Sequence, residues 1–240
     1  MSYRVTNHKL DGVEFVDTPN KDGEITPEII IIHSTESRLI TSTVRWFQSP
    51  TSKASAHLVM GRDGKLVQMV AFNQRAWHAG QSAWKGKPKC NSFAIGIELC
   101  NWGRVFIKDG VYKSVGGTVL EKNDVIEATH KLAPGKKFFW ETFTPEQISA
   151  SKELCMFLVD TYKLKDIVGH EDIALPQGRK TDPGPAFQMK ELRESVFGEG
   201  TPDDPFVGQD LENTKALMEV KESLVNAVKR IDYILNRRND

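Results

Sequence analysis

The segment from Val168 to Pro185 brings an imidazole, an ammonium group and a carboxylate close together in the chain, at His170, Lys180 and Asp182. Glycine and proline are frequent between them, which predicts a loop. Imidazole nitrogen and carboxylate oxygen are common ligands of a catalytic zinc ion, which takes three protein ligands and leaves one position open. The segment offers two good ligands, so a metal site here needs a third from elsewhere in the chain.

A third ligand is available at His33, directly after the apolar run 29–32. An unbroken β-branched run predicts a strand that is buried on both faces of a sheet, and ligand sites of open α/β sheets lie beyond the carboxyl ends of such strands. His170 likewise follows a short apolar segment, and Asp182 lies on a loop that can fold beside it. A single histidine is more often structural than a ligand. Two histidines with one carboxylate, however, are a familiar set for a hydrolytic zinc ion.

An acidic side chain interrupts the apolar segment 92–100, which we predict to be a strand. Large apolar residues alternate there with small residues and Glu98, so Glu98 shares its face with small side chains. If this face borders a cleft, Glu98 can act as a general base. If the segment is an edge strand, Glu98 points into solvent. Lys180 has the same two interpretations, because it either stabilises a developing oxyanion or is a surface lysine.

The loop 73–84 contains two tryptophans and a histidine, Trp77, Trp84 and His78. Aromatic faces stack well on sugar rings and peptide backbones, so these side chains could form the wall of a ligand site. The alternative is that the tryptophans fold back over the core. The loop sequence favours neither interpretation.

The remaining chain is predicted to form an α/β domain followed by a tail. The predicted elements are a strand over 13–16, a helix capped within 41–43 and stopped by Pro50, a hairpin over 56–70, an irregular insertion over 101–143, and helices over 144–162 and 187–197. A linker over 198–208 and an amphipathic helix over 209–240 follow the catalytic domain, residues 1–197. We expect this last helix to pack back on the domain or to form a homo-oligomer.

Composition excludes several classes of partner. The 240 residues contain 32 basic and 32 acidic side chains, so we expect neither nucleic-acid nor membrane binding. The N-terminus has no apolar signal region and no run reaches transmembrane length, so we expect a soluble protein made in the cytoplasm, although another export route remains open. The three cysteines have no paired spacing, which predicts buried free thiols.

Several separated motifs together resemble the zinc-dependent N-acetylmuramoyl-L-alanine amidases of the type-2 amidase family. This family includes phage lysozyme-type amidases, muropeptide-recycling amidases and peptidoglycan recognition proteins. The motifs, spread over about residues 25–197, are Ile32-His33-Ser34, Ser55-Ala56-His57, Arg75-Ala76-Trp77-His78-Ala79-Gly80, Ile95-Gly96-Ile97-Glu98-Leu99, Val168-Gly169-His170 and Lys180-Thr181-Asp182-Pro183-Gly184-Pro185. The resemblance implies an α/β fold in which helices flank a mixed central β-sheet, with a zinc cleft on one side.

The resemblance also implies roles for individual residues. His33, His170 and Asp182 match the zinc ligands, Glu98 the catalytic glutamate, and Lys180 the lysine that assists polarisation of the carbonyl. The loop residues Trp77 and His78 match a substrate-side loop, and we place His57 and Trp84 on the substrate side with them.

One departure separates the chain from part of the family. Phage lysozyme-type members have a cysteine as third ligand and a tyrosine before the histidine that matches His57. Here Asp182 and Ala56 occupy these positions, as in the recycling-type amidases. We therefore assign proton transfer to Glu98 and give no tyrosine a role.

The implied activity is hydrolysis of the amide between N-acetylmuramic acid and L-alanine in peptidoglycan or a muropeptide, by zinc-activated water. The insertion and the C-terminal helix favour a cell-wall-degrading lysin. The alternatives are a cytosolic amidase that recycles anhydro-muropeptides and a peptidoglycan-binding module without catalysis. A zinc peptidase acting on the stem peptide is a further alternative.

Overall fold

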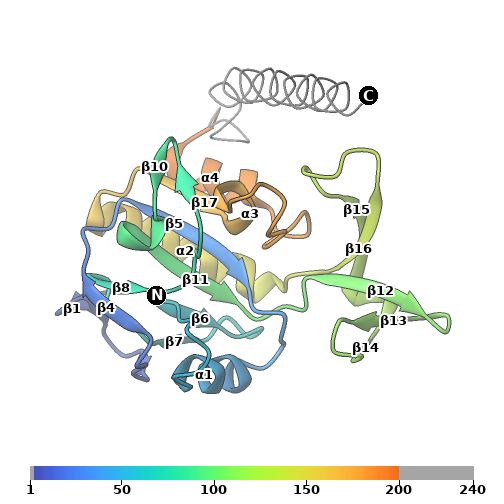
Figure 1. Cartoon of the computed structure of the whole chain (residues 1–240), viewed down its shortest axis with the longest axis horizontal. Coiled ribbons are helices and arrows are strands. Elements are labelled where there is room, and N and C mark those ends of the chain that lie inside the picture. Colours follow the sequence, from blue (N-terminus) through green and yellow to red (C-terminus); the bar gives the residue numbers. More distant parts are fainter. Residues whose placement is uncertain (1–2, 200–240) are drawn as a thin grey trace, which may run out of the picture. The chain divides into compact units, whose positions relative to one another are not determined.

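A mixed six-stranded sheet forms the centre of the protein in the computed structural model, which describes residues 3–199. The strand order is β17-β5-β11-β6-β7-β3, and β17, β5, β11 and β6 run parallel while β7 is antiparallel to β6 (Figure 1). The strands are β17 (Asp166–Gly169), β5 (Ile29–Ser34), β11 (Ala94–Leu99), β6 (Leu58–Met60), β7 (Leu66–Gln68) and β3 (Glu14–Phe15). The predicted mixed α/β sheet and its β6–β7 hairpin are confirmed.

Helices cover both faces of this sheet. On one face α2 (Pro145–Tyr162) and α4 (Met189–Phe197) contribute Leu154, Leu158 and Leu192 to a cluster with the strand side chains Ile30, Ile32, Ile95 and Ile97. On the other face α1 (Ile40–Gln48) places Phe47 against Val59 and Val67. All four isoleucines of β5 are fully buried, as expected for a strand covered on both sides.

The two predicted helix starts differ in outcome. Thr144 caps α2 as predicted, because its Oγ1 accepts from Gln147 N at 3.1 Å and Gln147 Oε1 accepts from Thr144 N at 3.2 Å. Helix α1 instead begins at Ile40 after Leu39, with no side-chain cap, so the prediction of a cap within 41–43 is wrong. Packing of Phe47, Ile40 and Val44 on the core, rather than capping, stabilises this helix.

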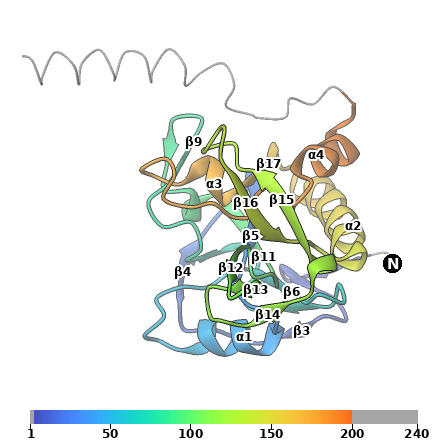
Figure 2. The same cartoon turned by 90° about the vertical axis from the view of Figure 1, so that its right-hand side faces the viewer.

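The insertion is more regular than predicted. It forms a five-stranded antiparallel sheet, in the order β14-β13-β12-β16-β15, at one side of the central sheet (Figures 1 and 2). Its strands are β12 (Arg104–Lys108), β13 (Val111–Ser114), β14 (Val119–Leu120), β15 (Val125–Thr129) and β16 (Lys137–Glu141). Gly110, Gly117 and Gly135 join them with positive φ angles, so the glycines that suggested irregular loops are tight-turn residues.

Short elements complete the part of the chain that the structure describes. They are β1 (Val5–Thr6), β2 (Lys9–Leu10), β4 (Lys21–Glu24), β8 (Gln74–Ala76), β9 (Ala83–Trp84), β10 (Lys87–Pro88), α3 (His170–Ile173) and two 3₁₀ turns, Cys90–Ser92 and Lys122–Asp124. The three cysteines are free and buried, as predicted. None of the helices within residues 3–199 has the length and apolar character needed to cross a bilayer. The predicted C-terminal helix over 209–240 and most of the predicted linker lie outside the described residues.

Candidate active site

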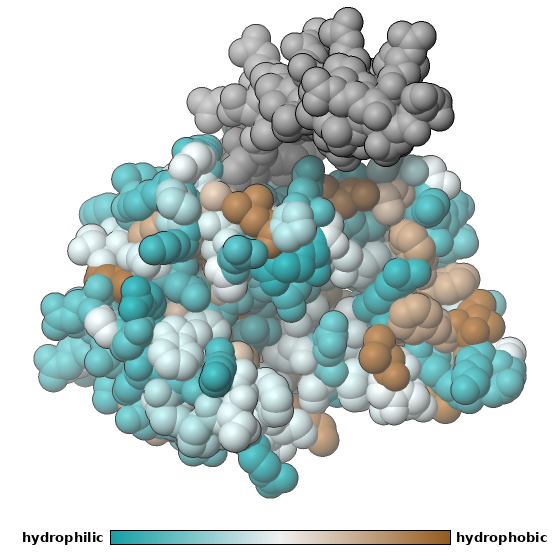
Figure 3. All heavy atoms as spheres, in the orientation of Figure 1, coloured by the Kyte–Doolittle hydropathy of each residue, from teal (hydrophilic) through white to brown (hydrophobic). Residues whose placement is uncertain are grey.

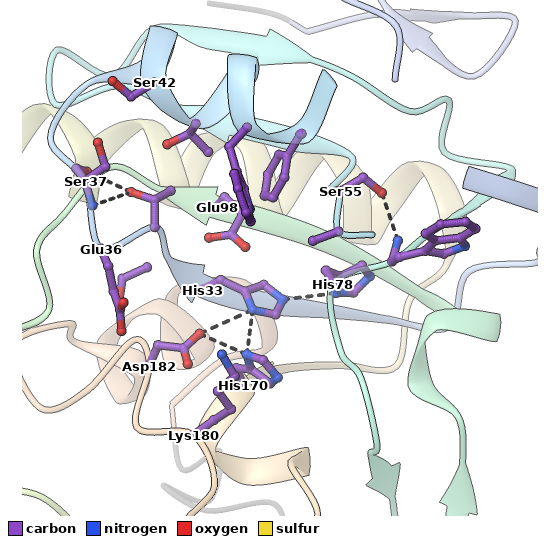
Figure 4. A pocket seen from close by; sticks show the side chains of 17 residues that line it. His33, Glu36, Ser37, Ser42, Ser55, His78, Glu98, His170, Lys180 and Asp182 are labelled. Atoms are coloured by element: carbon purple, nitrogen blue, oxygen red, sulfur yellow. Dashed lines mark hydrogen bonds and ion pairs between the residues drawn. The ribbon is translucent and has the colours of Figure 1, made fainter. Parts of the chain in front are cut away.

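The carboxyl ends of three adjacent parallel strands carry the candidate catalytic residues. His33 lies near the end of β5, Glu98 stands opposite it in register on β11, and His170 directly follows β17. Asp182 approaches from the loop after α3, so that all four side chains face one space (Figure 4). The strand topology therefore brings together residues that lie up to 149 positions apart in the sequence, from His33 to Asp182.

Three potential ligand atoms converge at the centre of this space. His33 Nδ1 lies 3.0 Å from His170 Nδ1, and Asp182 Oδ2 lies 3.3 Å from the first and 3.1 Å from the second. Both histidines are buried, with exposed fractions of 1% and 4%. The structure thus assembles the predicted set of His33, His170 and Asp182 as one cluster.

Hydrogen bonds on the far side of each ring determine which nitrogen faces the cluster. His78 Nε2 lies 3.4 Å from Ala94 O, and a carbonyl only accepts, so His78 carries its proton on Nε2 and accepts at Nδ1. The donor to that Nδ1 is His33 Nε2–H, at 3.0 Å. His170 Nε2–H donates to Ala79 O at 3.3 Å. In both histidines of the cluster, His33 and His170, the Nδ1 atom is therefore left with a lone pair.

The cluster consequently contains two lone pairs and a carboxylate with no proton between the two imidazoles. Burial lowers the pKa of His33 to about 4, assisted by the neighbouring His170, so protonation of His33 does not relieve the repulsion at neutral pH. A cation bound among the three atoms would relieve this repulsion. Two neutral imidazoles, each held by a hydrogen bond from its other nitrogen, together with one carboxylate fit a catalytic zinc ion.

Glu98 forms the floor of the same space. It lies on a central strand, so the edge-strand alternative is excluded, and its Oε2 is buried without a hydrogen-bond partner among residues 3–199. Burial raises the pKa of Glu98 to about 8, and the charge of Asp182 adds to this while Lys180 opposes it. A carboxyl group with a pKa near neutrality and a free oxygen can both take and return a proton.

A cavity of about 480 Å³ opens above these residues. Lys180 lines it with an exposed side chain, and Trp77 and His78 line it from the loop after β8, as predicted. Trp46 also lines it and is 57% exposed, a contact that the sequence analysis missed. The available signal was the adjacent pair of aromatic residues in a short helix. Phe47 is buried and also lines the cavity, whereas Trp46 lies about 100° round the helix from it and is exposed.

Two of the predicted substrate-side residues do not reach the cavity. His57 is fully buried, accepts from Gly96 N at 3.0 Å and donates to Gln74 O at 2.9 Å, so it joins β11 to β8. Trp84 is buried against Phe93, with ring centroids 6.3 Å apart. Each of the two interpretations of the loop therefore holds for one tryptophan, because Trp77 borders the cavity whereas Trp84 covers the core.

Gly96 is one of the small residues that share a face of β11 with Glu98. A Cβ atom at Gly96 would lie 2.5 Å from His78 Cγ, which is closer than real Cβ contacts occur. Gly96 therefore makes room for the imidazole that orients His33. The sequence pattern indicated a small-residue face but not this contact.

Comparison with known proteins identifies the family of this chain. Residues 23–185 match the family model Amidase_2, described as N-acetylmuramoyl-L-alanine amidase. The chain belongs to this amidase family. The predicted family resemblance is thus confirmed.

Among the amidase relatives, 1,6-anhydro-N-acetylmuramyl-L-alanine amidase AmpD of Escherichia coli K12 is 31% identical over 214 residues, which are 80% of this chain and 96% of the relative. N-acetylmuramoyl-L-alanine amidase AmiD of the same organism is 30% identical over 177 residues, 71% of this chain and 54% of the relative.

Solved structures of amidases share the fold. A selenomethionine derivative of AmpD superimposes with a TM-score of 0.54 at 26% identity, covering 80% of this chain and 99% of AmpD. A complex of E. coli AmiD with anhydro-N-acetylmuramic acid-L-Ala-D-γ-Glu-L-Lys also has a TM-score of 0.54, at 27% identity, covering 72% of this chain and 58% of AmiD.

Proposed function

We propose that this chain is a zinc-dependent amidase that hydrolyses the bond between N-acetylmuramic acid and L-alanine in anhydro-muropeptides. The observation that carries the proposal is the convergence of two imidazole lone pairs and the Asp182 carboxylate beside a Glu98 oxygen that has no hydrogen-bond partner in the described part of the chain. The names of the relatives AmpD and AmiD, and the ligand in the AmiD complex, support the substrate class.

This substrate class changes the preferred biological setting. From the sequence we favoured a wall-degrading lysin, because of the insertion and the C-terminal helix. The curated relatives include several proteins named as anhydro-muropeptide amidases, so they favour the recycling alternative. A soluble anhydro-muropeptide substrate is in keeping with a cytosolic recycling role.

The proposed metal site uses His33, His170 and Asp182 as ligands. Zinc bound there would polarise the scissile carbonyl and lower the pKa of a water molecule. His78 and the Ala79 carbonyl keep the two imidazoles in the tautomer that presents Nδ1 to the ion. With two neutral imidazoles and one carboxylate as ligands, a zinc ion would keep a net positive charge, which would stabilise a substrate oxygen that gains negative charge.

Glu98 carries the proton in the proposed reaction. Its free carboxylate oxygen takes a proton from water while the water oxygen forms a bond to the amide carbon. The same carboxyl group then gives a proton to the L-alanine nitrogen as the carbon–nitrogen bond breaks. The products are the lactyl carboxylic acid of the sugar and a peptide with a free amino terminus.

The other cavity residues bind and orient the substrate in this proposal. Lys180 lies on the same side of the cavity as Asp182 and can stabilise the negative charge on the carbonyl oxygen (Figure 4). Trp46 and Trp77 offer aromatic faces on which a sugar ring or a peptide can stack.

Mass spectrometry of digested anhydro-muropeptide tests the proposal, with zinc-loaded and chelated protein compared. We expect zinc-dependent release of the intact stem peptide and the anhydro-sugar. Cleavage within the stem peptide would favour the peptidase alternative. Binding without cleavage would favour the non-catalytic module. Faster digestion of intact sacculi than of soluble anhydro-muropeptide would restore the lysin interpretation.

A further inference from the structure

The turn between β15 and β16 of the insertion reaches the segment that carries two of the candidate metal ligands. His130, in this turn, is 2% exposed, and its Nε2 lies 2.7 Å from Glu171 Oε2 and 3.3 Å from Thr181 O. Glu171 directly follows His170, and Thr181 directly precedes Asp182. One imidazole nitrogen thus contacts both ligand-bearing stretches.

The orientation of the His130 ring is set by its neighbours. Its Nδ1 accepts from Leu132 N at 3.1 Å, so the proton lies on Nε2 and points to the two acceptors. The ring stacks on Trp140, with centroids 5.5 Å apart and planes 24° apart. A ring held by a hydrogen bond and by stacking is a rigid donor.

Glu171 depends on the insertion for both of its oxygens. Its side chain is buried, with an exposed fraction of 5% for the residue, and Lys131 Nζ lies 3.1 Å from Oε1 while His130 contacts Oε2. A buried carboxylate without partners is costly, so these two contacts decide whether Glu171 can stay in place. The Glu171 backbone N–H in turn donates to the carbonyl of Asp182 at 2.9 Å.

A packing contact adds to these hydrogen bonds. A Cβ atom on Gly184 would lie 2.6 Å from the Trp140 ring, so the chain after Asp182 packs directly against the insertion. Glu141, which follows Trp140 in β16, is fully buried and pairs with Arg38 and Arg62 of the central domain. The insertion is therefore fixed to the domain at its base and contacts the ligand-bearing loop at its tip.

We propose that His130 is a positioning residue for the metal site, which holds the backbones of His170 and Asp182 at the spacing that the ion requires. The inserted sheet is then a structural part of the site. The inference rests on the metal-binding part of the proposed function and not on which bond is cleaved. Groups that orient metal ligands typically change metal affinity by about 10–100-fold when they are removed.

Zinc affinity of the full chain, measured by competition with a chromophoric chelator, tests this role. His130→Phe keeps a ring for stacking on Trp140 but removes the N–H, and we expect about 10–100-fold weaker zinc binding. His130→Gln keeps an N–H at similar reach, and its affinity should return toward that of the wild type. Glu127→Gln, in the same hairpin at the 3.5 Å pair with Lys137, is the matched control and should leave affinity unchanged.

The outcomes separate positioning from general stability. Wild-type zinc affinity in His130→Phe would overturn the proposal, and so would an equal loss in Glu127→Gln. If His130→Phe does not fold, Glu171→Gln decides, because it weakens the same contact while keeping its shape. Unchanged zinc affinity there would overturn the proposal. Wild-type protein that binds zinc but cleaves no muropeptide would refute the proposed function and leave the positioning role standing.

Discussion

The central sheet and the inserted sheet are stabilised in different ways. The four isoleucines of β5 are fully buried between helices, whereas Phe106, Ile107 and Val119 of the insertion are 42%, 54% and 57% exposed. Figure 3 shows hydrophobic side chains, coloured brown, gathered at the side of the molecule where Figure 1 places β12 to β14. The inserted sheet buries fewer apolar side chains, among them Val105, Leu120 and Trp140, and has polar contacts to the domain at its base and tip.

The comparison teaches that the two regions divide the work at one site. In the proposed site the central sheet supplies most of the groups that would contact the metal and the reacting atoms, because parallel strands end together at one edge. The insertion supplies contacts to the backbone beside two of those groups. Changes in the central sheet should therefore abolish chemistry, and changes in the insertion should alter metal affinity or stability.

The largest effect is expected from removing a ligand at the end of a central strand. His170→Ala should lose both bound zinc and amidase activity down to background, because two remaining ligands do not hold the ion. Metal analysis and product mass spectrometry measure the two losses. His8→Ala, at an exposed histidine, is the control and should keep both. Full zinc occupancy in His170→Ala would refute the assignment.

A change at the base separates chemistry from metal binding. Glu98→Gln should keep zinc but lower kcat by about 10²–10⁴-fold, since the amide cannot accept the proton. The variant retains side-chain shape, so circular dichroism should match the wild type. Normal turnover in this variant would mean that another group transfers the proton.

The buried anchor of the insertion should affect stability more than chemistry. Glu141→Ala leaves Arg38 and Arg62 without their shared carboxylate, and we expect the free energy of unfolding in urea to fall by about 3 kcal/mol. The loss should be no larger because both guanidinium groups retain some contact with water. Lys163→Ala removes an exposed pair with Asp160 and should change stability by less than about 1 kcal/mol. Equal effects in the two variants would contradict the anchoring role.

The pH dependence of stability probes Glu98 in metal-free protein. Its pKa rises from 4.5 to about 8 on folding, so between these values the unfolded chain has released a proton that the folded chain keeps. Stability of chelated protein should therefore fall as pH increases through this window and level off above it. Glu98→Gln should remove this component from thermal melts. An unchanged pH profile in the variant would show that Glu98 is not the group responsible.

The smallest effect is expected at a helix end far from the site. Thr144→Ala removes the cap of α2 and should cost about 1 kcal/mol of unfolding free energy, without altering zinc affinity or kcat. Thr144→Ser keeps the hydroxyl and serves as control. A change in zinc affinity would show that α2 is coupled to the metal site more closely than its contacts indicate.

Local patterns were sufficient for the features that depend on neighbours in the sequence. The β-branched run 29–32 predicts a buried strand because its side chains on both parities are apolar, and Thr144 with Gln147 predicts a helix start because the cap is closed within four residues. The cluster of candidate ligands could be predicted for a similar reason, since His33 and His170 each come at the end of a short apolar run. The strand pattern and the spacing to Asp182 suggested roles for Glu98 and Lys180 beside solvent-exposed alternatives, and the family resemblance favoured those roles.

Other features depend on contacts between distant residues, and only folding decides them. The sequence around His57 and His78 does not show which of them lies beside His33. In the structure Gly96 makes room for the ring of His78 next to His33, whereas hydrogen bonds hold His57 in the interior. His130 is 41 positions from Glu171, and nothing within its own hairpin indicates that partner. The periodicity of a sequence shows which side chains share a face of a strand or helix. The partner of each side chain depends on how the sheets pack, so only the tertiary structure decided how the rings of His33 and His170 are oriented.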